Sequence, residues 1–221
     1  MFERKLLVTE DGSHSIYVEG LDEHYHSIHG ALQESQHVFI KNGLNNCEKK
    51  TISILEIGFG TGLNALLTLL EAQKNGLNIS YQTLEKFPLQ TYEYAELNFE
   101  KSMDIQNGLC LQELHNCIWE NDVQISQNFT LHKTQTDLEQ WQPNKMYDLI
   151  YFDAFAPDKQ PNLWTEAIFK KLFDAMNSNG ILSTYCAKGQ VRRNMITAGF
   201  SVARVPGPPG KREMMVARKC L

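Results

Sequence analysis

The sequence has few features of an exported or membrane-embedded protein. Its five cysteines are odd in number and scattered, without the close pairs of a zinc site or a disulfide framework. No apolar run approaches the ~18–20 residues that cross a bilayer, because Asn64 and Thr68 interrupt the longest candidate, from Leu63 to Leu70. The N-terminus is charged where a signal peptide needs an apolar stretch. These absences predict a soluble protein with reduced thiols in the cytoplasm.

Internal repeats, low-complexity tracts and flexible linkers are absent as well, so the 221 residues are expected to fold as one domain. A hydrophobic share of 42% with 10% aromatic residues is enough to fill a core and argues against disorder. We expect an N-terminal extension over residues 1–50, packed on a core over residues 51–221.

The formal net charge of -5 conceals an uneven distribution. From Ile181 to the C-terminus, eight basic residues stand against one acid, Glu213, so a tail of about +7 follows a body of about -12. Such a tail can present a cationic face to phosphates. Solvated lysines and arginines that balance an acidic body are the simpler interpretation.

The order of the expected elements indicates an α/β fold. The pattern of residues 5–18 predicts a β-hairpin that turns at Asp11-Gly12. Residues 24–44 carry apolar side chains at roughly helical spacing. From residue 51 onward strands and helices alternate, which implies a parallel sheet covered on both faces. The expected strands cover residues 52–57, 79–84, 129–133, 147–152, 181–185, 200–205 and 213–217, and the expected helices cover 63–74, 88–99, 165–176 and 188–198, with an inserted helix near 103–128.

A glycine-rich loop follows the first strand of this core. Glu56 precedes glycines at positions 58, 60 and 62, and a helix follows them. Glycines there allow a tight turn and let a ligand lie against a helix N-terminus. The spacing departs from the G-x-G-x-x-G of dinucleotide-binding folds and resembles motif I of class I S-adenosylmethionine methyltransferases. We therefore expect Glu56, Gly58, Gly60 and Gly62 to bind that cofactor; a glycine-rich turn that binds nothing is the alternative.

Acidic residues follow three of the expected strands. Glu85 ends the second strand, where a carboxylate can accept hydrogen bonds from both ribose hydroxyls of a nucleoside. Asp137, near the end of the third, can accept one from an adenine amino group. Asp153 ends the fourth and is followed by Phe155 and Pro157, at the sheet edge where open α/β sheets bind ligands. Exposed strand-end acids, or Asp153 as a helix N-cap, are the alternatives.

Three further stretches resemble the methyltransferase component of the MnmC family. They are FAPDKQPNLWT at 155–165, GQVRR at 189–193 and GKREM at 210–214, and the resemblance extends from about Tyr25 through Met215. It implies an α/β class I methyltransferase fold with a Rossmann-like sheet, to which the residue pattern adds the N-terminal hairpin and helix extension. It also implies S-adenosylmethionine as methyl donor.

The substrate that the resemblance implies is tRNA, recognised at its anticodon stem-loop and methylated on 5-aminomethyl-2-thiouridine at the wobble position. Bifunctional members of the family carry a flavin-dependent oxidase domain after the methyltransferase. The chain ends at Leu221 without a second dinucleotide motif, so it resembles the stand-alone, MnmD-like form.

Methyl transfer to an amine is an in-line displacement that needs a neutral nitrogen, whereas an alkylamine is mostly protonated at neutral pH. Asp153 is the expected catalytic residue. With a carboxyl pKa near ~4 it is a poor base unless burial raises that pKa, so we expect it to orient the amine and offset its developing charge. The aromatic rings of Phe155, Trp164 and Tyr185 are candidates to contact the flipped-out base or the sulfonium, and packing in the core is the alternative for each.

The basic residues of the C-terminal region are the expected tRNA-docking groups. The full set of expected substrate- and tRNA-binding residues is Phe155, Pro157, Lys159, Trp164, Lys188, Arg192, Arg193, Lys211 and Arg212.

The sequence is also compatible with two other functions. One is a class I methyltransferase or aminopropyltransferase that acts on a small-molecule amine, and the other is a nucleoside- or RNA-binding module without turnover. No metal site is expected, because His24, His26 and His29 have no evident fourth ligand. Cys186 is expected to be a buried small hydrophobe rather than a nucleophile.

Overall fold

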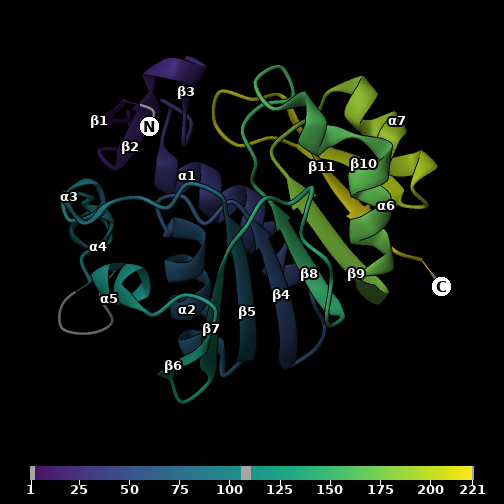
Figure 1. Ribbon diagram of the computed structural model, residues 1–221, viewed down its shortest axis with the longest axis horizontal. Helices are drawn as coiled ribbons and strands as arrows, with labels where there is room; N and C mark the ends of the chain where they lie inside the picture. Colours follow the sequence, from purple (N-terminus) through teal and green to yellow (C-terminus); the bar gives the residue numbers. More distant parts are fainter. Residues whose placement is uncertain (1–2, 106–110, 221) are drawn as a thin grey trace.

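An eight-stranded mixed sheet runs through the centre of the molecule (Figure 1). The computed structural model describes residues 3–105 and 111–220. The strands lie in the order β10-β11-β9-β8-β4-β5-β7-β6. Their bounds are Thr51–Ile57 for β4, Asn78–Glu85 for β5, Asp122–Ser126 for β6, Phe129–Gln135 for β7, Tyr147–Phe152 for β8, Met176–Thr184 for β9, Ser201–Pro206 for β10 and Glu213–Arg218 for β11.

The middle of this sheet is parallel, since β7, β5, β4, β8 and β9 pair in that order with parallel registers. Strands β11 and β10 continue it antiparallel on one side, and β6 closes the other side antiparallel to β7. The α/β class expected from the sequence is confirmed, but the expected parallel sheet is mixed, because the strands at both of its sides pair antiparallel.

Helices cover both faces of the sheet (Figure 1). The bounds are Leu63–Asn75 for α2, Thr91–Tyr94 for α3, Phe99–Ser102 for α4, Leu111–Asn116 for α5, Glu166–Asp174 for α6 and Gly189–Thr197 for α7, with a 3-10 turn η4 at Pro161–Trp164. The strands bury alternate residues on opposite faces, so that Ile52 and Ile54 pack on the side of α2, and Leu55 and Ile57 on the side of α6 and α7.

Two expected helices differ from the structure. The segment 88–99 forms the short helices α3 and α4, because Asn98 between them holds the N-terminal hairpin: its side chain accepts from the His14 N–H and donates to the Gly12 carbonyl. The segment 103–128 holds helix α5 and strand β6, and the part of it at 106–110 lies outside the described residues.

The N-terminal segment forms the expected hairpin and then a helical stretch. Strands β1 (Arg4–Val8) and β2 (His14–Val18) pair antiparallel, and β3 (Glu23–His24) adds to β2. The remaining bounds are Glu19–Leu21 for the 3-10 turn η1, Ala31–Ser35 for α1, Gln36–Lys41 for the π-helical η2 and Leu44–Asn46 for the 3-10 turn η3. The hairpin is tied to the core by Arg4, whose guanidinium is buried against Glu93 at 3.0 Å. No helix in the described part of the chain is long and apolar enough to span a membrane.

Candidate active site

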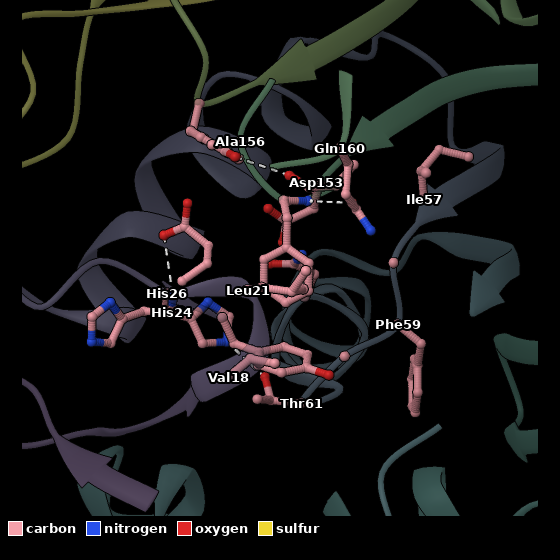
Figure 2. Close-up of a pocket in the computed structure, with 18 of the residues that line it drawn as sticks. Val18, Leu21, His24, His26, Ile57, Phe59, Thr61, Asp153, Ala156 and Gln160 are labelled. Carbon is pink, nitrogen blue, oxygen red and sulfur yellow. Dashed lines mark hydrogen bonds between the residues drawn. The ribbon is translucent and has the colours of Figure 1, made fainter. Parts of the chain in front are cut away.

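A cavity of about 590 Å³ opens where the parallel strands β4, β5, β7 and β8 end. Its wall combines the glycine loop, the acids that follow the strands, and the N-terminal segment. Figure 2 shows His24 and His26 of the N-terminal segment around the same space as Asp153 and Gln160, which follow β8. The sheet edge expected from the sequence to bind a ligand therefore carries a cavity.

Two of the three glycines of the loop lie in the cavity wall. Gly58 has φ +89°, and a Cβ there would stand 2.9 Å from the Asp153 carbonyl; Gly60 has φ +49°, and a Cβ would stand 2.9 Å from the Tyr25 ring. These positions leave no room for a side chain. Gly62 caps α2 and faces His115. It was expected to bind the cofactor with the other two glycines, but it lies outside the cavity wall.

Glu85 and Asp137 both reach the cavity from neighbouring strand ends. Glu85 accepts hydrogen bonds from the backbone N–H groups of Gly60 at 3.0 Å and Phe87 at 2.7 Å, so it joins β5 to the glycine loop. Asp137 pairs with Lys86 at 2.6 Å. Partial burial opposes ionisation of Asp137, but hydrogen bonds, led by the one from Lys86, outweigh it and lower the pKa of this carboxyl.

Asp153 lies in the same wall, fixed by a 2.8 Å hydrogen bond that the Asn64 amide donates to its Oδ2. Burial, and then the negative charge of Glu34, raise the pKa of Asp153 to about 7, against the opposing effects of Asn64 and Lys211. The sequence predicts an orienting role for Asp153, because an ordinary carboxyl is too weak a base. The structure places this side chain where burial removes that objection.

Glu56 was expected to bind cofactor, but it lies beneath the loop and outside the cavity wall. Its side chain is fully buried on the α2 side of the sheet, and neither carboxyl oxygen has a hydrogen-bond partner among the described residues. Burial is the main cause that raises the pKa of Glu56 to about 8. At neutral pH this carboxyl is therefore mostly a neutral acid.

A pH-dependent stability follows for Glu56. Its pKa is about 8 in the folded protein and 4.5 ordinarily, so the folded state keeps a proton that the unfolded chain has released. The free energy of unfolding therefore falls as pH rises from about 4.5 through about 8. The isosteric variant Glu56→Gln is expected to match the natural protein at pH ~5 and to exceed its stability at pH ~9. Urea unfolding across this pH range tests the prediction, with Glu48→Gln, at an exposed position, as control. The same pH dependence of stability in Glu56→Gln and in the natural protein would contradict it.

The N-terminal segment contributes wall residues that sequence reasoning did not assign. His26 is buried, its Nε2 lies 2.7 Å from the hydroxyl of Thr61 in the glycine loop, and burial lowers the pKa of His26 to about 4. Glu34 accepts from the Ser27 N–H at 2.7 Å and forms an ion pair with Lys211 at 2.5 Å. The described residues contain no group of three or more potential metal ligands.

The expected aromatic contacts divide between cavity and core. Phe155 lines the cavity and packs edge-on against Tyr25, with ring centroids 5.1 Å apart. Trp164 is 2% exposed and lies in the core, where its Nε1–H donates to the Phe155 carbonyl at 2.8 Å, so it supports the wall without forming it. Tyr185 lines the cavity, and Cys186 beside it is buried.

The expected docking residues likewise occupy two environments. Lys211 points into the cavity, whereas Lys188 is exposed and pairs with Asp158, and Lys159 pairs with Asp22 at 3.5 Å. Arg193 is exposed and donates to Gln190.

The remaining members of the expected set lie outside the wall. Arg212 is exposed, Arg192 is half-buried, and neither forms an ion pair within the described part of the chain. Pro157 is half-buried and is not among the wall residues.

Comparisons with known proteins agree with this architecture. A family model described as S-adenosyl-L-methionine-dependent methyltransferase matches residues 78–220. The chain is 30% identical over 216 residues to the tRNA 5-methylaminomethyl-2-thiouridine biosynthesis bifunctional protein MnmC of Pseudoalteromonas atlantica, in a match that covers 88% of the chain and 30% of that protein. The chain thus spans about a third of the length of the curated relatives that it matches.

Solved structures share the fold. MNMC2 from Aquifex aeolicus superposes with a TM-score of 0.81 at 25% identity, covering 98% of this chain and 70% of that one. Spermidine synthase from Thermotoga maritima superposes with a TM-score of 0.52 at 11% identity, covering 94% and 68%, which is a likeness of fold alone.

Proposed function

Because the chain belongs to the family of S-adenosyl-L-methionine-dependent methyltransferases, we propose that it methylates the aminomethyl group of 5-aminomethyl-2-thiouridine at the wobble position of tRNA, giving 5-methylaminomethyl-2-thiouridine. The observation that carries the proposal is that the Asp153 carboxyl, fixed by the Asn64 amide at 2.8 Å, lies in the wall of the same cavity as the glycine loop. The names of the relatives that match over most of the chain support tRNA as the substrate.

The wall residues fit the cofactor of the family. Gly58 and Gly60 expose bare backbone to the cavity, which lets a ligand lie against the loop. Two carboxylates on adjacent strands face the same space, and in our assignment Glu85 holds the ribose hydroxyls and Asp137 the adenine amino group. When bound, S-adenosyl-L-methionine supplies an electrophilic methyl group. The bond from this methyl group to sulfur breaks as the bond to the acceptor nitrogen forms.

Asp153 has two tasks in this mechanism. The acceptor amine is protonated in water, with an ordinary pKa near ~10, and has to lose that proton before its lone pair can attack. A carboxylate with a pKa of about 7 is a far better proton acceptor than one near 4. Asn64 holds one oxygen of Asp153 at 2.8 Å, which leaves the other to accept a hydrogen bond from the amine and then its proton. The products are the methylated amine in its ammonium form, the neutral thioether that the methyl group has left, and protonated Asp153.

The proposal is tested with tRNA that lacks only the last methyl group. Nucleoside mass spectrometry before and after addition of protein and S-adenosyl-L-methionine is expected to show one methyl gained on the wobble nucleoside. Methylation of a small amine in the same assay, with the tRNA nucleoside unchanged, would contradict the proposal and indicate that the acceptor is a small-molecule amine.

The basic residues outside the cavity are the proposed tRNA-docking groups. Replacing Arg192, Arg193 and Arg212 by alanine is expected to weaken tRNA binding and to flatten its salt dependence by up to roughly 2 units, because each phosphate contact releases counterions. Affinity measured at several salt concentrations tests this. Lys50→Ala is the control, because Lys50 precedes β4 at the amino end of the strand, whereas the cavity lies at the carboxyl ends. An unchanged slope with a lowered melting temperature would assign these arginines to stability.

A further inference from the structure

The ammonium group of Lys211 occupies a position inside the cavity. It lies 2.5 Å from Glu34 Oε1 and 4.0 Å from the centroid of the Tyr185 ring. All three side chains line the cavity together with Asp153, whose pKa both charged groups affect. A carboxylate beside an aromatic face is the combination that recognises alkylammonium ions.

The surroundings of this ammonium group are held in place without it. Glu34 is fixed through its other oxygen by the Ser27 N–H at 2.7 Å, and its side chain is only 9% exposed. Tyr185 is fixed by its hydroxyl, which donates to the Ala154 carbonyl at 2.9 Å. Removing the Lys211 side chain would therefore leave a preorganised site of the same chemistry.

The backbone around Lys211 is fixed while the side chain has room to leave. Its N–H donates to the Pro208 carbonyl at 2.9 Å, and Gly207 donates to the Arg212 carbonyl at 3.2 Å, so the loop between β10 and β11 closes on itself. The Lys211 side chain is 33% exposed, which gives it a path to solvent.

Resting on the proposed function, we propose that Glu34, Tyr185 and Asp153 form the subsite for the primary amine of the acceptor, and that the Lys211 ammonium occupies this subsite until the acceptor displaces it. The exchange replaces one ammonium ion by another, so the charge beside Glu34 is conserved. The acceptor then lies next to Asp153, the group that takes its proton.

The test uses n-butylammonium as probe, without tRNA or cofactor. In Lys211→Met, the probe at about five times its Kd is expected to raise the melting temperature by about 2–4 °C. Its Kd is expected to be at least ~10-fold lower than in the natural protein, where Lys211 competes. Lys170→Met is the matched control, because Lys170 also has a carboxylate partner, Asp174, and an aromatic neighbour, Phe173, but lies on α6 outside the cavity.

Several outcomes would overturn the subsite. They are an absence of probe-dependent stabilisation in Lys211→Met, equal stabilisation by the neutral n-butanol, and undiminished stabilisation in the double variant that adds Glu34→Gln. If Lys211→Met does not fold, Lys211→Gln is measured in its place with the same criteria. Because the readout is binding of a simple amine, stabilisation without tRNA methylation would contradict the proposed function and leave the subsite supported.

Discussion

Replacing Asp153 by alanine is expected to lower the rate of methyl transfer by at least ~100-fold, while affinity for the cofactor changes by no more than a few fold. The variant removes the proton acceptor, but Glu85, Asp137 and the glycine loop remain. Single-turnover kinetics and calorimetry measure the two effects separately. Near-normal single-turnover rates in the alanine variant would assign Asp153 to structure.

The pH dependence gives a second readout for Asp153. Its pKa is about 7, so the carboxylate form is lost as pH falls through 7, and the rate is expected to fall with it. Asn64→Leu removes a hydrogen bond that lowers the pKa of Asp153, so the acidic limb should move to higher pH. Asp153→Asn keeps the shape and is expected to be slow at every pH. A natural-protein profile without this limb would exclude Asp153 as the base.

Removing the Glu85 carboxylate is expected to weaken cofactor binding by about 2–4 kcal/mol, or roughly 30- to 1,000-fold, because about two charge-assisted hydrogen bonds are lost. Glu85 also holds the Gly60 and Phe87 N–H groups. Glu85→Gln is therefore measured alongside Glu85→Ala, since its amide oxygen can still accept one of these hydrogen bonds. Glu139→Ala, an exposed acid outside the cavity wall, is the control. Calorimetry with S-adenosyl-L-methionine decides, and unchanged affinity in folded Glu85→Ala would remove Glu85 from the cofactor site.

The parts of the site that the sequence predicted are those with local signals. An apolar run that ends in glycines marks both a strand and its loop, and Glu85 and Asp153 stand directly at strand ends, which meet at one edge of a parallel sheet. Glu56 fits the same pattern but points away from the cavity. Its place is decided by strand alternation, which puts it on the α2 side with Ile52 and Ile54.

The wall contributed by the N-terminal segment could not be derived in this way. Tyr25, His26 and Glu34 reach the cavity through contacts with residues far along the chain, and no local periodicity encodes such contacts. The only signal was that Tyr25 and Glu34 lie in the region that resembles the MnmC family. Strand β6 was missed for a related reason: it is a five-residue edge strand, stabilised by pairing with β7 rather than by its own pattern.

The ion pair between Glu34 and Lys211 joins positions 177 residues apart in the chain. A ribosome releases the chain from its N-terminus, so the residues of the hairpin and helix α1 are synthesised well before those of the loop between β10 and β11. Until then Gly210 and Lys211 are missing from the wall of the cavity, and the Glu34 carboxylate lacks its cation. The nascent protein therefore has no enclosed pocket in which to hold a nucleoside until the last strands of the sheet are in place.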